Sequence, residues 1–292
     1  MTQWAATTDE VGRWVGEQVD SDVTVELAKV RPWAVVWQAT DDRDRSWWAK
    51  QNCPGQAFEA ELVAVLARLA PAYVVPVAAA DTRRGLLLTP DQGQVFAETV
   101  RDDDIDAWVR LVQRAMELAR ATADHGADLL ATGLTASRVP ESVADRVARA
   151  REEAGAAGLP DTLVHNDLHE HNAFDDPAGL RFFDFADAVW DHPLTGLLVP
   201  LNMLASHLGD PGPDDGRMRR VADAALEVWT DRASLAELRR ALAPALRLGR
   251  LARAESWARI EPHLDSGDLD DFGGAVDAWL DRLDDPLPVS FA

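Results

Sequence analysis

Cysteine is nearly absent: the 292-residue chain contains one, Cys53. An intramolecular disulfide is therefore impossible, and a reducing, cytoplasmic location is expected. The first ten residues lack a basic region followed by an apolar core, so we predict no signal peptide. The most apolar stretch, residues 62–80, contains Arg68, Pro71 and Pro76, which argues against a membrane span.

Positive charge is also scarce, since 29 Lys and Arg oppose 50 Asp and Glu and give a formal net charge of −21. Nucleic acids and anionic membranes attract clustered Lys and Arg, so neither is expected as a partner. Residues 1–96 carry 9 basic and 13 acidic groups (net −4), and residues 97–292 carry 20 and 37 (net −17). A cationic small molecule would suit the second part, although acidic faces also serve solubility. Only two of the cations are lysines, Lys29 and Lys50, so both deserve inspection.

The hydrophobic pattern divides the chain into a strand-rich first part and a helical second part. Alternating apolar residues between polar turns predict strands, and apolar residues at helical spacing predict helices. The predicted order in the first part is helix, three strands, helix and two strands, at residues 7–20, 23–30, 33–39, 46–50, 57–69, 73–79 and 85–89. Helical patterns dominate from residue 104 onward, with short strands at residues 163–164 and 180–185. We therefore predict an α+β protein with two domains, residues 1–92 and 93–292.

One segment carries the residue types that phosphoryl transfer needs. The sequence His-Asn-Asp-Leu-His-Glu-His-Asn at residues 165–172 follows a short apolar strand, and Asp184 lies near the end of the next one. In phosphoryl transfer, one carboxylate orients and deprotonates the attacking hydroxyl, while an amide oxygen and a second carboxylate hold Mg²⁺ against the triphosphate. Hard oxygen ligands suit Mg²⁺, which takes few protein ligands. Asp167 is thus predicted as the base, and Asn172 and Asp184 as metal ligands.

These residues resemble the catalytic core of the aminoglycoside phosphotransferase and choline kinase-like family, which is related to the protein kinases. The family pattern His-x-Asp-x-x-x-x-Asn falls on His165, Asp167 and Asn172, and the metal-binding Asp falls on Asp184. The resemblance implies a two-lobed, protein-kinase-like fold with a small β-rich N-terminal lobe and a larger, mainly helical C-terminal lobe. It also implies the cofactors ATP and Mg²⁺ and a small-molecule acceptor.

The same resemblance implies a lysine on the third strand that engages the α- and β-phosphates. Lys50 ends the third predicted strand. Such a lysine needs an acidic partner on the following helix, which contains Glu59 and Glu61. We prefer Glu59, because it stacks with Val63 and Leu66 at helical spacing, and Glu61 stays an alternative.

The end of the fifth predicted strand resembles the segment that holds adenine in this family. The carbonyl of Thr89 and the N–H of Asp91 would bind the base, and Pro90 falls between them, where no N–H is required. GTP is not excluded, because backbone groups of this kind are not specified by sequence. One expected feature is missing: residues 29–34, at the first hairpin turn, contain no glycine that would let backbone amides approach the phosphates.

Three other interpretations compete with this one. His165, His169 and His171 could form a zinc site, but their spacing lacks the two-histidine helical signature and no cysteine is near. A protein kinase usually carries a lysine two residues after the catalytic Asp, where His169 stands, and no Ala-Pro-Glu-type segment follows Asp184. A non-catalytic nucleotide-binding module would have no need of the base Asp167.

The acceptor is the least specified part of the prediction. His169, Asp187 and Trp190 follow the predicted catalytic residues and are candidates for contacts with it. The acidity of residues 97–292 favours a cationic acceptor such as an aminoglycoside or amino sugar, which would imply antibiotic resistance. Choline-like alcohols, sugars, nucleosides and basic peptide antibiotics stay open, and the sequence predicts no oligomeric state.

Overall fold

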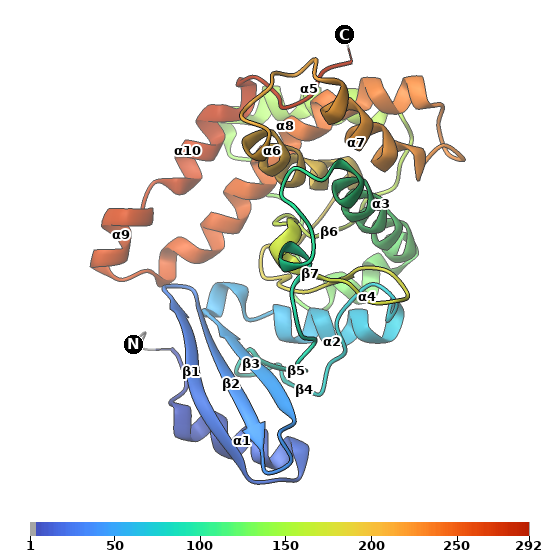
Figure 1. Cartoon of the computed structure of the whole chain (residues 1–292). Helices are drawn as coiled ribbons and strands as arrows, with labels where there is room; N and C mark the ends of the chain where they lie inside the picture. The colour runs from blue at the N-terminus through green and yellow to red at the C-terminus, as the bar shows by residue number, and fades with distance from the viewer. Residues whose placement is uncertain (1–3, 292) are drawn as a thin grey trace.

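The computed structural model describes residues 4–291, and residues 1–3 and 292, which the predicted domains include, lie outside this range. The N-terminal part is built on one antiparallel sheet with the strand order β1-β2-β3-β5-β4. Its strands are β1 (Val23–Arg31), β2 (Ala34–Asp41), β3 (Ser46–Asn52), β4 (Ala79–Asp81) and β5 (Leu86–Pro90). The chain after β5 is mainly helical and lies at one end of this sheet (Figure 1). The two-lobed α+β architecture agrees with the prediction.

The two faces of the sheet have different partners. Alternate residues of a strand point to opposite faces. One set, which includes Trp37 and Ala49, is buried against the helix α1 (Thr8–Val19). The other set, which includes Val36 and Lys50, faces the helical lobe and lines a cavity there. The alternation of β2 and β3 therefore supplies both the core of the small lobe and one wall of the cavity.

The strand predicted at residues 73–79 is wrong in position. β4 begins later, and the segment before it pairs with the helical lobe instead. The Val75 N–H donates to the Phe182 carbonyl at 3.1 Å, and the Phe182 N–H donates to the Tyr73 carbonyl at 2.8 Å. Pro76 follows this segment and has no N–H to offer a sheet ladder. The contact ties the small lobe to the segment that carries the second predicted metal ligand.

Helices form most of the C-terminal lobe (Figure 1). The α-helices after α1 are α2 (Glu59–Leu69), α3 (Ile105–Thr122), α4 (Gly126–Leu130), α5 (Ala144–Gly155), α6 (Leu198–His207), α7 (Gly216–Glu227), α8 (Leu235–Ile260), α9 (Ser266–Phe272) and α10 (Ala275–Asp281). The short 3-10 helices are η1 (Pro54–Gln56), η2 (Phe96–Glu98), η3 (Ala123–His125), η4 (Glu141–Val143), η5 (Glu170–Asn172), η6 (Pro193–Leu197), η7 (Glu261–His263) and η8 (Arg282–Asp284). Within residues 4–291, none of the helices combines the length and the apolar character that a bilayer span requires.

Two small antiparallel sheets carry the 165–172 loop and the segment around Asp184. Their strands are β6 (Thr162–Val164) with β9 (Val189–Asp191), and β7 (Ala173–Phe174) with β8 (Arg181–Phe182). The strand predicted at residues 180–185 is therefore shorter than expected. Asp184 has a φ of 65°, a left-handed conformation that ends the extended run and turns the chain at this point.

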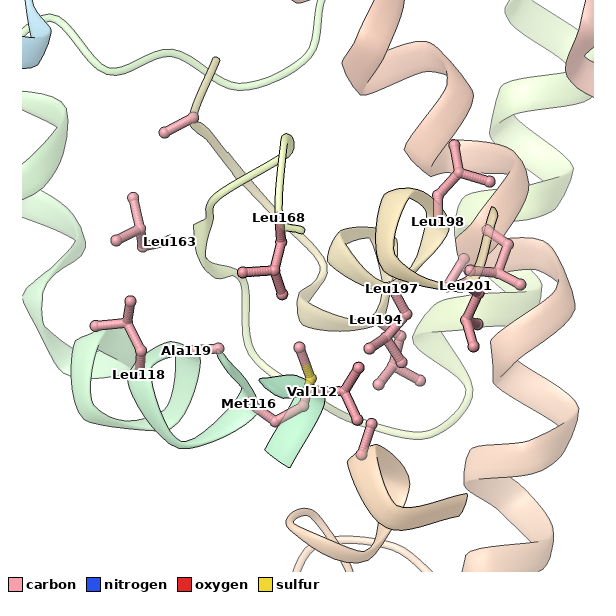
Figure 2. Packing of buried hydrophobic residues seen from close by; sticks show 14 of the residues in the cluster. Val112, Met116, Leu118, Ala119, Leu163, Leu168, Leu194, Leu197, Leu198 and Leu201 are labelled. Atoms are coloured by element: carbon pink, nitrogen blue, oxygen red, sulfur yellow. The ribbon is translucent and has the colours of Figure 1, made fainter. Parts of the chain in front are cut away.

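The core of the helical lobe anchors the 165–172 loop (Figure 2). Leu168, the residue after Asp167, is 1% exposed and belongs to this core. Figure 2 shows its side chain directed toward Met116 and Val112 of α3 and Leu194 of η6. Burial of one leucine side chain contributes about 1.5–3 kcal/mol. The apolar residue thus fixes the backbone at the position where the polar ones are needed.

The first hairpin of the sheet touches the far end of the helical lobe. Trp33, in the β1–β2 turn, packs edge-on against Trp257 of α8 and Phe272 of α9, with ring centroids 5.5 and 5.2 Å apart. Gly55 of η1 lies so close to the end of α8 that a Cβ atom there would be 1.8 Å from the Arg259 carbonyl oxygen. These contacts hold the small lobe against α8 and α9.

Replacement of Gly55 tests this close contact. Gly55→Ala should lower the free energy of unfolding by about 1–3 kcal/mol, because the backbone of α8 must move to admit the methyl group. Gly155→Ala is the matched control, since a Cβ at the end of α5 meets nothing within 4 Å. That variant should be neutral or more stable by up to about 1 kcal/mol. Equal thermal unfolding of both variants would contradict the contact.

Candidate active site

A cavity of about 440 Å³ lies between the sheet and the helical lobe. The predicted site residues that line it are Lys50, Glu59, Thr89, Asp167, Asp184 and Asp187. Asn172 lies beside it, and its amide nitrogen donates to the Asp167 carbonyl at 2.8 Å. Asp91, His169 and Trp190 are not among the lining residues. The fold thus brings most of the predicted residues together from both lobes.

The Lys50 ammonium lies between two carboxylates. Its Nζ atom is 2.6 Å from Asp184 Oδ1 and 2.7 Å from Glu59 Oε2. Burial alone would lower the pKa of Lys50, but the negative charges of Asp184 and Glu59 outweigh it and raise this pKa above its usual value. Lys50 is therefore a fixed positive charge at the cavity wall. Glu61 is exposed on α2, so the structure pairs Lys50 with Glu59.

Glu59 begins α2 and is 1% exposed. Besides Lys50, its Oε2 atom accepts a hydrogen bond from Asn52 Nδ2 at the end of β3. Burial raises the pKa of Glu59, and the Lys50 charge opposes this rise. A buried carboxylate needs such partners, because an unpaired one would carry the full cost of desolvation. The pair therefore sets the position of α2 relative to β3.

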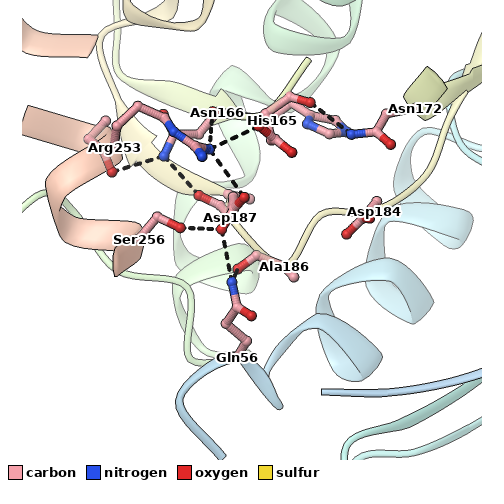
Figure 3. A network of polar contacts seen from close by, with 12 residues as sticks. Gln56, His165, Asn166, Asn172, Asp184, Ala186, Asp187, Arg253 and Ser256 are labelled. Atoms are coloured by element: carbon pink, nitrogen blue, oxygen red, sulfur yellow. Dashed lines mark hydrogen bonds and ion pairs between the residues drawn. The ribbon is translucent and has the colours of Figure 1, made fainter. Parts of the chain in front are cut away.

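The 165–172 loop is tied to α8 and to the segment around Asp184. Asn166 has a φ of 65°, a conformation that asparagine tolerates better than most residues. Its Nδ2 atom donates to the Ala252 carbonyl at 2.9 Å and to the Asp187 carbonyl at 3.0 Å (Figure 3). His165 Nε2 lies 2.9 Å from the Phe183 carbonyl oxygen. The strained turn is thus held in place from both sides.

Arg253 of α8 reaches the predicted base. Its NH1 atom is 3.1 Å from Asp167 Oδ1 and 3.1 Å from Asp187 Oδ2. Burial acts to raise the pKa of Asp167, but the His169 ring, whose Nε2 is 3.8 Å from Oδ2, and the Arg253 charge outweigh it and lower this pKa to about 2. Asp167 is therefore ionised at neutral pH. Sequence reasoning missed Arg253, because α8 contains several arginines and nothing in their spacing distinguishes one.

Asp187, predicted to contact the acceptor, has a different set of partners. Gln56 of η1 donates to its Oδ1 atom at 2.8 Å, and the Ser256 hydroxyl donates to the same atom (Figure 3). Its other oxygen holds Arg253. Through these contacts Asp187 orients Arg253 toward Asp167 and links the two lobes. Neither Gln56 nor Ser256 carries a signal in the sequence, since both are common polar residues far from the motif.

Asn172 and Asp184 present oxygen atoms that suit Mg²⁺. The Asn172 amide nitrogen donates to the Asp167 carbonyl and lies 3.1 Å from His169 Nε2, which leaves the amide oxygen for a cation. Asp184 Oδ1 is paired with Lys50, and its second oxygen has no hydrogen-bond donor among residues 4–291. One amide and one carboxylate oxygen match the few hard ligands that Mg²⁺ takes from proteins. The donor set fits this ion.

The zinc interpretation does not fit the geometry. Burial lowers the pKa of His165, whose ring packs 4.6 Å from that of Phe185. His169 contacts Asn172, and His171 lies 3.8 Å from Glu170. The rings of His169 and His171 lie 5.8 Å apart, but residues 4–291 contain no group of three His, Cys, Asp or Glu side chains placed to hold a metal ion.

Trp190 lies away from the cavity. It is the middle residue of β9, and its N–H donates to the Thr135 carbonyl at 3.0 Å. The indole contacts Gly126, where a Cβ atom would be 2.8 Å from Trp190 Cζ2. The indole therefore packs on the start of α4 and does not stack on anything in the cavity. Strand register decides this direction, which proximity in sequence to Asp184 did not reveal.

The segment after β5 differs from the prediction by one residue. The Asp91 N–H donates to the Ser46 carbonyl at 2.9 Å, so it belongs to the sheet. Backbone groups of alternate residues face the same neighbour in an antiparallel ladder, so the Thr89 carbonyl also faces β3. The Pro90 carbonyl faces away from β3 and accepts a hydrogen bond from Gln92 Nε2 at 3.0 Å. The Gln92 N–H has no hydrogen-bond acceptor among residues 4–291, and both residues line the cavity. The prediction for the Thr89 and Asp91 backbone atoms was wrong, because sequence does not reveal register.

Trp48 is a further residue of this wall that sequence reasoning missed. It lies two residues before Lys50 on the same face of β3 and lines the cavity. Its Nε1 atom donates to Asp91 Oδ1 at 3.0 Å, so the Asp91 side chain orients the indole ring. A flat, oriented aromatic surface therefore lies next to the Pro90 carbonyl and the Gln92 N–H.

No protein-family model and no curated protein sequence matches this chain. Several solved structures, in contrast, are similar to it. An ethanolamine kinase of Plasmodium vivax has a TM-score of 0.65 and 11% identity, over 91% of this chain and 83% of that chain. The amicoumacin kinase hAmiN, solved with AMP-PNP and Ca²⁺, has a TM-score of 0.60 and 15% identity, over 98% and 96%. The aminoglycoside 2′-phosphotransferase-IIIa, solved with GDP, has a TM-score of 0.55 and 13% identity, over 95% and 98%. The chain has the two-lobed, protein-kinase-like fold of these kinases and phosphotransferases.

Proposed function

We propose that the protein is an ATP-dependent phosphotransferase that transfers the γ-phosphate to a hydroxyl group of a small molecule. The observation that carries this proposal is the meeting of Lys50, Asp167, Asn172 and Asp184 at one cavity. A module that only binds nucleotide would need the lysine, but it would not need an ionised base beside the metal donors. The fold shared with small-molecule kinases and phosphotransferases supports the same reaction class.

The nucleotide would bind along the sheet. The Pro90 carbonyl and the Gln92 N–H offer one acceptor and one donor to the edge of a purine, and the Trp48 indole offers a surface for stacking. Lys50 would engage the phosphates, and Glu59 would keep its side chain extended. The AMP-PNP in the amicoumacin kinase supports ATP. GTP stays the alternative, because the aminoglycoside 2′-phosphotransferase was solved with GDP.

The chemical step would depend on Asp167. The acceptor hydroxyl donates a hydrogen bond to this carboxylate, which Arg253 holds in place. The acceptor oxygen forms a bond to the γ-phosphorus, the bond from that phosphorus to the bridging oxygen breaks, and ADP leaves. Since the pKa of Asp167 is about 2, the carboxylate takes the proton only as the new O–P bond forms and the hydroxyl becomes acidic. Mg²⁺ held by Asn172 and Asp184 would neutralise charge on the phosphates.

We propose that the acceptor is cationic. The α9–α10 region lies beside the β1–β2 turn (Figure 1). Its aspartates are Asp265, Asp268, Asp270, Asp271, Asp277 and Asp281. None of them forms an ion pair within the described part of the chain, so their field is available to attract a positive charge. Ethanolamine and aminoglycosides, the acceptors named for two of the similar structures, support an amine-bearing alcohol, and an aminoglycoside acceptor would make this a resistance enzyme.

Asp167→Asn tests the reaction. The amide cannot take the proton, so kcat should fall by a factor of ~10²–10⁴ while ATP binding persists. The matched control is Asp161→Asn, at an exposed position before β6, which should retain full turnover. Release of ADP by both variants at the wild-type rate, with phosphorylated acceptor, would overturn the assignment.

Glu59→Gln tests the pairing of Lys50. Loss of the buried negative charge should raise KM for ATP by ~10-fold, because Lys50 is then oriented by Asp184 alone. Glu61→Gln removes a charge from the exposed face of the same helix and should leave KM unchanged. Steady-state kinetics at saturating acceptor compare the two variants. If Glu61→Gln has the larger effect, the pairing is wrong.

Matched acceptors test the charge preference. Ethanolamine should be phosphorylated with a lower KM than ethylene glycol, and glucosamine with a lower KM than glucose, at low ionic strength. The difference should shrink at 0.5 M NaCl, where the screening length falls to ~4 Å. The variant Asp270→Asn/Asp271→Asn should raise KM for the amines only. Equal KM values for charged and neutral partners would argue against a cationic acceptor.

A further inference from the structure

Two cations of β1 line the cavity and have no part in the site described so far. Lys29 and Arg31 lie on its wall, on the same side as Lys50. The chain contains only two lysines, and both of them are therefore at this cavity. Neither Lys29 nor Arg31 forms an ion pair with any residue in the range 4–291. Most of the arginines of the helical lobe, in contrast, are paired with carboxylates.

A β-bulge aims these two side chains into the cavity. From Val23 to Leu27, β1 pairs residue by residue with β2, and Leu27 lies opposite Trp37 on the α1 face. The register then shifts, so that Lys29 lies opposite Val36 and Arg31 opposite Ala34, both cavity residues. Directly opposed side chains share a face of the sheet. Without the shift, Lys29 would share the face of Leu27, because side chains alternate with a period of two.

The turn that follows cannot supply the backbone amides that a glycine-rich loop would. Pro32 has no N–H, and no glycine lies near it in the turn. The Trp33 carbonyl accepts a hydrogen bond from the Cys53 N–H at 2.7 Å, and its indole is packed against Trp257 and Phe272. The turn is therefore held in place through both the backbone carbonyl and the indole ring of Trp33. Anion binding at this wall must come from side chains.

The charge of the cavity also requires more cations than Lys50. Its wall contains five carboxylates: Glu59, Glu98, Asp167, Asp184 and Asp187. Lys50 is already shared between two of them. A nucleoside triphosphate brings several further negative charges, which repel carboxylates at short range. Lys29 and Arg31 are the cations of the described wall that have no carboxylate partner and can meet this charge.

We propose that Lys29 and Arg31 bind the polyphosphate of the nucleotide through their side chains, in the place of the backbone amides of a glycine-rich loop. This inference rests on the proposed nucleotide site. Guanidinium and ammonium groups form charge-assisted hydrogen bonds to phosphate oxygens, and Arg31 offers the bidentate geometry. The nucleotide affinity then depends on the number of phosphates, and adenosine gains nothing from these two residues.

Calorimetric titration with ATP, ADP and adenosine, each with Mg²⁺, tests the proposal. Lys29→Gln and Arg31→Gln should each weaken ATP binding by ~10-fold, and the double variant by ~100-fold. ADP should lose less, and adenosine should bind unchanged. Arg43→Gln is the matched control: it removes the same charge from an exposed turn at the other end of the sheet and should leave all three affinities unchanged.

A relocation variant separates position from net charge. Lys29→Val/Val30→Lys keeps the composition and moves the ammonium to the opposite face, where Val30 is 46% exposed and a lysine is tolerated. It should bind ATP as weakly as Lys29→Gln. Wild-type affinity in this variant, or in the double Gln variant, would overturn the proposal and leave the phosphotransferase assignment intact. If the wild-type protein binds no nucleotide, both the proposal for Lys29 and Arg31 and the proposed function are overturned. If it binds nucleotide but transfers phosphate to no acceptor, only the proposed function is contradicted, because the titration still measures the contributions of Lys29 and Arg31.

Discussion

The ammonium group of Lys50 is the point on which both lobes converge. It comes from β3, the central strand of the sheet, and pairs with Glu59 of α2 and with Asp184 of the helical lobe. The pairing compensates the desolvation of Lys50 and Glu59, which would otherwise be costly, whereas the Asp184 side chain is 43% exposed. It also fixes the direction of α2 and the left-handed turn at Asp184. The position of Asp184, the proposed metal ligand, is therefore set by a residue far from it in sequence.

A second set of contacts supports the opposite side of the cavity. Arg253 lies between Asp167 and Asp187, while Asn166 reaches the backbone of α8. Gln56 adds a link from the small lobe to Asp187. The 165–172 loop is thus braced by a helix that follows it by many residues. A loop that combines the left-handed backbone of Asn166 with the ionised side chain of Asp167 needs such contacts to keep one conformation.

The first hairpin of the sheet combines a rigid turn with positively charged side chains on β1. The first hairpin has little freedom, because Trp33 is held between α8 and α9. A rigid hairpin without glycine cannot wrap a ligand with its backbone, and the bulge in β1 offers side-chain charge instead. The same cavity wall carries five carboxylates, and the acidic α9–α10 region lies beside the turn between β1 and β2. Lys29 and Arg31 therefore place positive charge among acidic groups.

The sequence by itself determined which residues were predicted for the centre. Asp167, Asn172 and Asp184 could be named because they lie in one short stretch and because phosphoryl transfer demands a base and hard oxygen donors. The order of strands and helices followed from hydrophobic periodicity, and the two-lobed arrangement was implied by the resemblance to the kinase-like family. The strand at residues 73–79 was misplaced, since its amides pair with Phe182, and such pairing depends on a partner far along the chain.

Only the tertiary structure decided which other residues line the cavity and which contacts hold the predicted residues in place. Register turned the Pro90 carbonyl away from β3, at the wall of the cavity, and a bulge of one residue turned Lys29 toward the same cavity. Packing selected Glu59 over Glu61 and brought Arg253 to the base. A one-residue shift reverses the face of a strand, and a long-range ion pair depends on every turn between its partners. Neither leaves a local pattern in the sequence.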